Sequence, residues 1–197
     1  MRKSTPETGA TRDTGPTGQV GAGFEGRLGE ELAAVVAGAR RRAFRDGDRQ
    51  VDTAHLLHTL LEADPRARAA IAGGPPQVAR LLGYLAQRAI GYGVQWSGSV
   101  EDSGAVPRMC PRDGDGGDGR LGGGALSGWS PAAAAAMGGA IARAGARGAS
   151  RAEGPDLLAA LAGDPECRAV EVLRRAGVDA ELLVAALNGE MRQESTT

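Results

Sequence analysis

The chain has 197 residues, a formal net charge of −1 at pH 7 and only 3% aromatic residues. A nearly neutral chain gives no global electrostatic reason to expect nucleic acid or an anionic membrane surface as a partner. Alanine supplies much of the 42% hydrophobic content, and it favours closely packed helices, whereas a sheet would need more β-branched and aromatic residues. We therefore expect an all-α protein that binds neither nucleic acid nor membranes.

Three segments lack helical periodicity. Residues 1–26 are rich in Gly, Thr and Pro and are predicted to be disordered, because they offer too little apolar surface to offset the entropy of ordering. Residues 96–128 are predicted to be a Gly/Asp-rich flexible linker, and residues 191–197 a polar tail. No apolar run resembles a secretion signal or could span a bilayer, so we expect a cytoplasmic location.

Residues 27–95 predict a first unit of four helices. Asp52 or Thr53 is expected to cap the second of them, because a side-chain oxygen there can accept the unpaired amides of the first turn. The helical patterns cover residues 28–44, a stretch containing Leu56, Leu57, Leu60 and Leu61, residues 65–71, and residues 75–89.

Residues 129–190 predict a second unit of the same kind. Ser130 as the N-cap and Pro131 at the first helical position mark its start. Its helical patterns cover residues 131–146, a stretch with Leu157, Leu158 and Leu161, one with Val170, Val172 and Leu173, and a last one with Leu182, Leu183, Ala186 and Leu187.

The two units carry copies of one motif. Residues 51–65 read VDTAHLLHTLLEADP, and residues 152–165 read AEGPDLLAALAGDP. Each copy is preceded at the same distance by a helical pattern with spaced alanines, which indicates a duplicated helical unit. The predicted fold is therefore an all-α, duplicated four-helix repeat.

This order of motifs resembles the N-terminal domain of Clp-type AAA+ unfoldases of the ClpA/ClpC class. The resemblance covers about residues 28–95 and 129–189. It implies a compact pseudo-two-fold arrangement of eight helices that acts as a docking platform for adaptors or substrates of an ATPase ring feeding a protease. The matching positions are Ala39, Ala43, Gly47, Val51, Thr53 and His55 in the first unit, and Trp129, Ser130, Pro131, Ala133, Ala140, Ala144 and Gly148 in the second.

The chain departs from this family in three ways. It has no G-x-x-x-x-G-K-[ST] phosphate loop, so it looks like the docking domain without the ATPase module. Family members that recognise phosphorylated arginine carry a Glu before the His of each motif, whereas Ala54 and Pro155 occupy those positions here. The second His is replaced by Asp156. Phosphoarginine binding by the same means is therefore not expected.

The resemblance also implies an apolar groove between the units, lined by aromatic residues, where actinobacterial relatives can bind cyclic peptides. Trp129 occupies one aromatic position and Phe24 lies near the other, and together with Leu28 they are the candidate ligand-binding residues. Alternatively, Trp129 simply packs the start of its helix. The Ala-, Gly- and Arg-rich composition is typical of a high-GC actinobacterial source.

Arginines crowd the end of the first predicted helix. Arg40, Arg41 and Arg45 are candidates for binding an acidic partner, although cations are also favourable near the carboxyl end of any helix.

The sequence predicts no reaction. His55 and His58 lie three residues apart but have no further ligand at a recognised spacing, and Cys110 and Cys167 are expected to be free thiols. We therefore expect no metal, no cofactor and no enzymatic activity.

The leading hypothesis is a non-catalytic protein- or peptide-binding module of the Clp system, an adaptor, substrate-docking or decoy domain. The alternative is a protein that sequesters cyclic-peptide antibiotics directed at Clp unfoldases.

Overall fold

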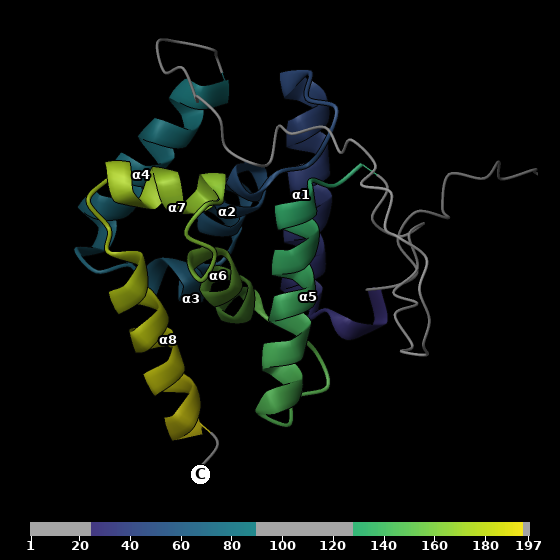
Figure 1. Cartoon of the computed structure of the whole chain (residues 1–197), viewed down its shortest axis with the longest axis vertical. Helices are drawn as coiled ribbons and strands as arrows, with labels where there is room; N and C mark the ends of the chain where they lie inside the picture. The colour runs from purple at the N-terminus through teal and green to yellow at the C-terminus, as the bar shows by residue number, and fades with distance from the viewer. Residues whose placement is uncertain (1–24, 90–127, 195–197) are drawn as a thin grey trace, which may run out of the picture.

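The computed structural model describes residues 25–89 and 128–194, and within these ranges every regular element is helical (Figure 1). The prediction of an all-α, duplicated four-helix fold is confirmed. The elements are η1 (Glu25–Arg27), α1 (Glu30–Asp46), α2 (Thr53–Ala63), α3 (Pro65–Ala69), α4 (Gly74–Ala89), α5 (Pro131–Ala146), α6 (Gly154–Ala162), α7 (Arg168–Arg175) and α8 (Ala180–Glu194). The disorder predicted for residues 1–26 falls outside the described residues up to position 24, and the predicted linker falls outside them up to position 127.

The helix ends follow the capping chemistry of the sequence. The Asp52 carboxylate accepts the backbone N–H of His55 at 2.9 Å and so caps α2. Ser130 accepts the N–H of Ala133 at 3.1 Å and caps α5, with Pro131 at the first helical position. The first repeat comprises α1 to α4 and the second repeat comprises α5 to α8. Helix α1 starts at Glu30 rather than at Leu28, because Leu28 forms a bridge with Ala152 of the second repeat.

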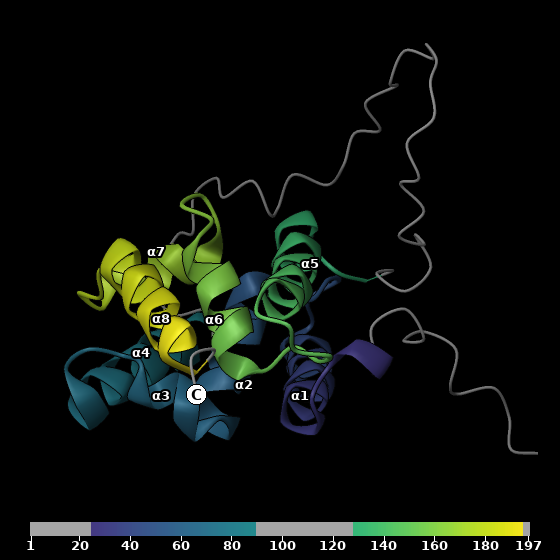
Figure 2. The same cartoon turned by 90° about the horizontal axis from the view of Figure 1, so that it is seen from below.

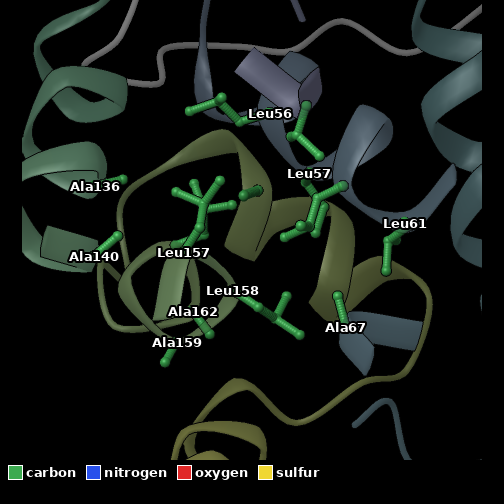
Figure 3. Packing of buried hydrophobic residues seen from close by; sticks show 14 of the residues in the cluster. Leu56, Leu57, Leu61, Ala67, Ala136, Ala140, Leu157, Leu158, Ala159 and Ala162 are labelled. Carbon is green, nitrogen blue, oxygen red and sulfur yellow. The ribbon is translucent and has the colours of Figure 1, made fainter. Parts of the chain in front are cut away.

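Helices α2 and α6 form the centre of the molecule (Figures 1 and 2). Helix α2 packs against α1 and α4 of its own repeat and against α5, α6 and α7 of the other, while α6 packs against α2, α3, α5, α7 and α8. Figure 3 shows Leu157 and Leu158 of α6 between the alanines of α5 and the leucines of α2. The small side chains of α5, Ala133, Ala136 and Ala140, let the helices approach closely.

The two repeats are joined by a pair of equivalent parallel bridges. Leu28, at the start of the first repeat, pairs with Ala152, which lies just before α6. Trp129, at the start of the second repeat, pairs with Val51, which lies just before α2. The hydrogen bonds that close these bridges are 2.7 to 2.9 Å long, among them Gly29 N to Ala152 O and Val51 N to Gly128 O. Each repeat therefore supplies backbone hydrogen bonds to the segment that precedes the central helix of the other repeat, α2 or α6.

Gly154, the first residue of α6, lies against the first repeat. A β-carbon added there would come within 1.6 Å of Oδ2 of Asp64, whose side chain is buried and caps α3. The two repeats therefore meet at a position where only glycine fits without displacement.

We predict that Gly154→Ala lowers the free energy of unfolding by about 1 to 3 kcal/mol, because the methyl group displaces a buried carboxylate. Gly138→Ala in α5 is the matched control, since a β-carbon there meets nothing within 4 Å. The control should be neutral or stabilising, as is usual for Gly→Ala within a helix. Urea unfolding of both variants measures the difference, and equal midpoints would contradict the close approach.

Candidate docking site

Trp129 lies at the junction of the two repeats and is largely covered. Its relative exposure is 6%, and its backbone forms the bridge to Val51. The guanidinium of Arg40 lies 5.4 Å from the centre of the indole ring, within the range of a cation–π contact. Arg40 therefore covers one face of the indole ring.

The structure describes one of the other two predicted ligand-binding residues. Leu28 is 4% exposed and occupies the bridge equivalent to that of Trp129. Phe24 lies outside the described residues. Among the groove candidates that the structure describes, both large side chains are therefore part of the core.

The predicted arginine cluster divides by environment. Arg41 and Arg45 are exposed, while Arg40 is half-buried over Trp129. Arg45 lies 3.6 Å from the neighbouring Asp46. Arg42, on the side of α1 that faces α2, pairs with Glu62 at 2.5 Å and so connects the two helices.

Phe44 is the residue that the sequence analysis missed. It is 88% exposed, and among the described residues only Leu182, at 69%, is a comparably exposed large apolar side chain. Its neighbour Ala43 is 3% exposed and continues the buried stripe of α1. Because successive helical residues point about 100° apart, Phe44 could have been recognised as lying off that stripe.

A hollow of about 250 Å³ lies beside Phe44, where the end of α1, the following turn and the start of the second repeat meet. Its apolar wall consists of Ala43, Val51 and Gly128 together with Phe44. Arg40, Arg49 and Asp48 supply its polar rim. We call this surface the Phe44 face.

A second hollow, of about 320 Å³, is less suited to binding. It is lined largely by alanines and glycines of α5 and α6, and it presents no exposed aromatic side chain. Arg143, on its wall, already donates to Asn188 at 2.6 Å. The larger hollow therefore offers volume without an anchor, and the Phe44 face is the better candidate.

Of the two positions at which family members that recognise phosphoarginine carry a Glu, Ala54 is buried and Pro155 is half-buried, while Asp156, which replaces the second His of the motif, is buried. Ala54 is 1% exposed, and Asp156 is likewise 1% exposed. The Asp156 carboxylate accepts the backbone N–H of Glu153 at 2.9 Å and two hydrogen bonds from Arg147, at 2.6 and 3.2 Å. Asp156 therefore stabilises the start of α6 and forms an ion pair with Arg147.

His55 and His58 occupy separate environments. His55 is 1% exposed, with Nδ1 2.7 Å from Asp52 and Nε2 3.0 Å from Asp48. His58 is 6% exposed and lies 3.3 Å from Glu62 in the next turn. The structure therefore does not bring the two imidazoles to one site.

Comparison with known proteins supports the fold. The chain matches no protein-family model and no curated protein sequence. It is similar to the solved structure of the N-terminal domain of the caseinolytic protease-associated chaperone ClpD from Arabidopsis thaliana, with 15% identity and a TM-score of 0.51 over 84% of this chain and 95% of that one. It is also similar to a structure from preliminary investigations of a malarial protein secretion system, with 15% identity and a TM-score of 0.54 over 85% of this chain and 97% of that one. The chain thus has a fold similar to that of a Clp N-terminal domain.

In the described ranges, no helix combines the length and apolarity needed to cross a membrane.

Cys167, predicted to be a free thiol, is buried and forms no disulfide; its Sγ donates to the carbonyl of Leu161 at 3.3 Å.

We predict that His58 makes the protein less stable in acid. Burial, reinforced by the charge of Arg42 and opposed by Glu62, lowers the pKa of His58 from 6.5 to about 4. The unfolded chain therefore binds a proton below pH 6.5 that the folded protein accepts only near pH 4, and stability falls as the pH drops through this window. Urea midpoints of the wild type and His58→Gln, measured from pH 7.5 to pH 4, should show a shallower decline in the variant. An identical decline would contradict the assignment.

Proposed function

We propose that this chain is a non-catalytic protein-binding module of the Clp N-terminal type, which docks acidic peptide segments at the Phe44 face. The observation that carries the proposal is the 88% exposure of Phe44 beside a hollow rimmed by arginines. Aromatic side chains and arginines are enriched in the cores of protein interfaces, where a few such residues supply most of the binding energy.

The charges around Phe44 favour an acidic occupant. Arg41 and Arg45 are exposed on the same end of α1, and Arg40 and Arg49 line the hollow itself. Asp46 and Asp48 are the nearby acids, and both lie within 4 Å of the buried His55. A segment carrying Asp or Glu around one large apolar residue would meet cations at the rim and the Phe44 ring at the centre.

The relation to Clp proteolysis rests on the fold. An all-helical fold similar to that of a Clp N-terminal domain suits a docking role, as an accessory adaptor or as a decoy that captures segments directed at an unfoldase. A binding role is supported by Phe44, the most exposed large apolar side chain among the described residues, which borders the hollow.

The alternative function, sequestration of a cyclic peptide, depends on access to Trp129. The 6% exposure of Trp129 and the guanidinium above its ring leave the acidic-peptide proposal with the stronger support.

A fluorescein-labelled peptide with acidic residues flanking one phenylalanine and one leucine provides the test. We expect saturable binding that weakens with added salt, and a loss of about tenfold in affinity in Phe44→Ala, as is typical when a central aromatic anchor is truncated. Leu182→Ala is the matched control, because it removes the other exposed large apolar side chain, and it should bind like the wild type.

Equal binding by wild type and Phe44→Ala would rule out the Phe44 face. The Clp assignment is tested separately by affinity capture from cytosol with the same two variants. Enrichment of a Clp subunit, adaptor or degradation substrate that is lost in Phe44→Ala and kept in Leu182→Ala supports it, and a capture that never enriches such a protein contradicts it.

A further inference from the structure

The surface around Phe44 is specific to the first repeat. Ala43 of α1 and Ala144 of α5 hold equivalent places, so the residue equivalent to Phe44 is Gly145, which has no side chain. At the positions of the three arginines near the end of α1, the second repeat has Ile141, Ala142 and Ala146. The equivalent helix of the second repeat therefore ends without these groups, so the repeat fold does not itself require them. This contrast favours a binding role for the Phe44 face.

A segment of the chain itself begins at this face. Gly128 lines the hollow beside Phe44, and its carbonyl oxygen accepts the backbone N–H of Val51 at 2.7 Å. This contact fixes the point at which residues 90–127, which lie outside the described residues, rejoin the helices. The residues just before Gly128 are therefore tethered to the wall of the hollow.

The sequence of this segment has the chemistry that the Phe44 face favours. Asp113, Asp115 and Asp118 place three carboxylates within six residues, with only glycines between them. Leu121 follows three positions later and supplies a large apolar side chain. Carboxylates are attracted to the exposed arginines at the rim of the hollow, and the leucine is a match for the exposed phenylalanine. The segment thus resembles the acidic peptides for which the face is suited.

The tether raises the local concentration of these groups at the face. Asp118 is ten residues before Gly128, and ten residues span at most about 35 Å when fully extended. Residues 119–127 include four glycines, and glycine lets a chain turn back on itself at little steric cost. A group on a short tether has an effective concentration on the order of millimolar at a site within its reach, so a contact with a dissociation constant of about 1 mM is made in about half of the molecules.

We propose that residues 113–121 are an intramolecular ligand of the Phe44 face and compete there with acidic peptides from solution. The inference rests on the proposed function, because it assigns a regulator to the same docking surface. An added peptide binds only those molecules in which the face is unoccupied, so its apparent affinity is reduced by that fraction. The chain itself therefore sets a threshold, and only peptides that bind more tightly than its own acidic segment are captured.

The triple variant Asp113→Asn/Asp115→Asn/Asp118→Asn of the full chain tests the inference with the same fluorescein-labelled acidic peptide. Loss of the three carboxylates weakens the internal competitor, so we expect the variant to bind the peptide about two- to tenfold more tightly than the wild type. This range corresponds to a competitor with a dissociation constant of about 1 to 0.1 mM at an effective concentration of about 1 mM.

The matched control is Glu101→Gln/Asp102→Asn, which removes two carboxylates of the same segment that lie farther from Gly128 in the sequence. Measured in about 0.15 M salt, where charges more than about 8 Å apart are largely screened, the control should bind the peptide like the wild type. Equal unfolding temperatures of the three proteins show that the substitutions leave the helical fold intact.

Proton–nitrogen NMR without peptide provides a readout that does not depend on the proposed function. The amide signals of Phe44 and Arg49 should differ between the wild type and the triple variant and should coincide between the wild type and the control. The inference is overturned if these signals are the same in all three proteins, or if the triple variant and the control bind the peptide equally tightly. If the peptide binds none of the three proteins, the docking function fails, and the amide signals alone decide whether the segment occupies the face.

Discussion

The buried pair between Asp52 and Arg168 is the contact on which the arrangement of the two repeats depends. The Asp52 carboxylate caps α2, contacts the imidazole of His55 and accepts a hydrogen bond from Arg168 of α7 at 2.6 Å. Both side chains are less than a tenth exposed. A buried charge left without its partner typically costs about 3 to 5 kcal/mol. The start of the first repeat's central helix therefore needs a residue of the second repeat.

A second ion pair between the repeats forms at the equivalent place before α6, but it is more exposed to solvent. Glu153, at the N-cap of α6, pairs with Arg66 of α3, and both side chains are roughly half-exposed. Exposed ion pairs contribute little to stability. The pair of Glu153 and Arg66 should therefore stabilise the protein less than the pair of Asp52 and Arg168. Together with the two bridges, these crossings hold the ends of α1 and α5 at the junction, where Arg40 covers Trp129 and Phe44 remains outside.

Much of the fold could be predicted from the sequence because its determinants are local. Leucines and alanines recur at helical spacing within each helix. The caps Asp52 and Ser130, and Pro131 at a helix start, act within the first turn of their own helix. The duplicated motif then indicated the arrangement. Asp156 looked like a divergence from His55, yet both residues accept the N–H of the N-cap residue three positions earlier, so the capping role is kept by different chemistry.

The site was less predictable because it depends on contacts between distant segments. Trp129 is an aromatic residue in a chain with few of them, but its burial depends on Arg40 and Val51 of the other repeat. The pairing of Asp52 with Arg168 spans 116 positions of sequence and has no local signal. Phe44 could have been found from its place off the apolar stripe, whereas the hollow beside it forms only when the second repeat packs against α1.

Native-state hydrogen exchange followed by mass spectrometry tests most directly whether the repeats stabilise each other. If each completes the central helix of the other, the slowest amides of α2 and α6 should open with the same free energy. Replacing Arg168 with Met should then lower both values by the same amount. If α2 loses protection in this variant while α6 keeps the protection of the wild type, the repeats are independent units and the account is wrong.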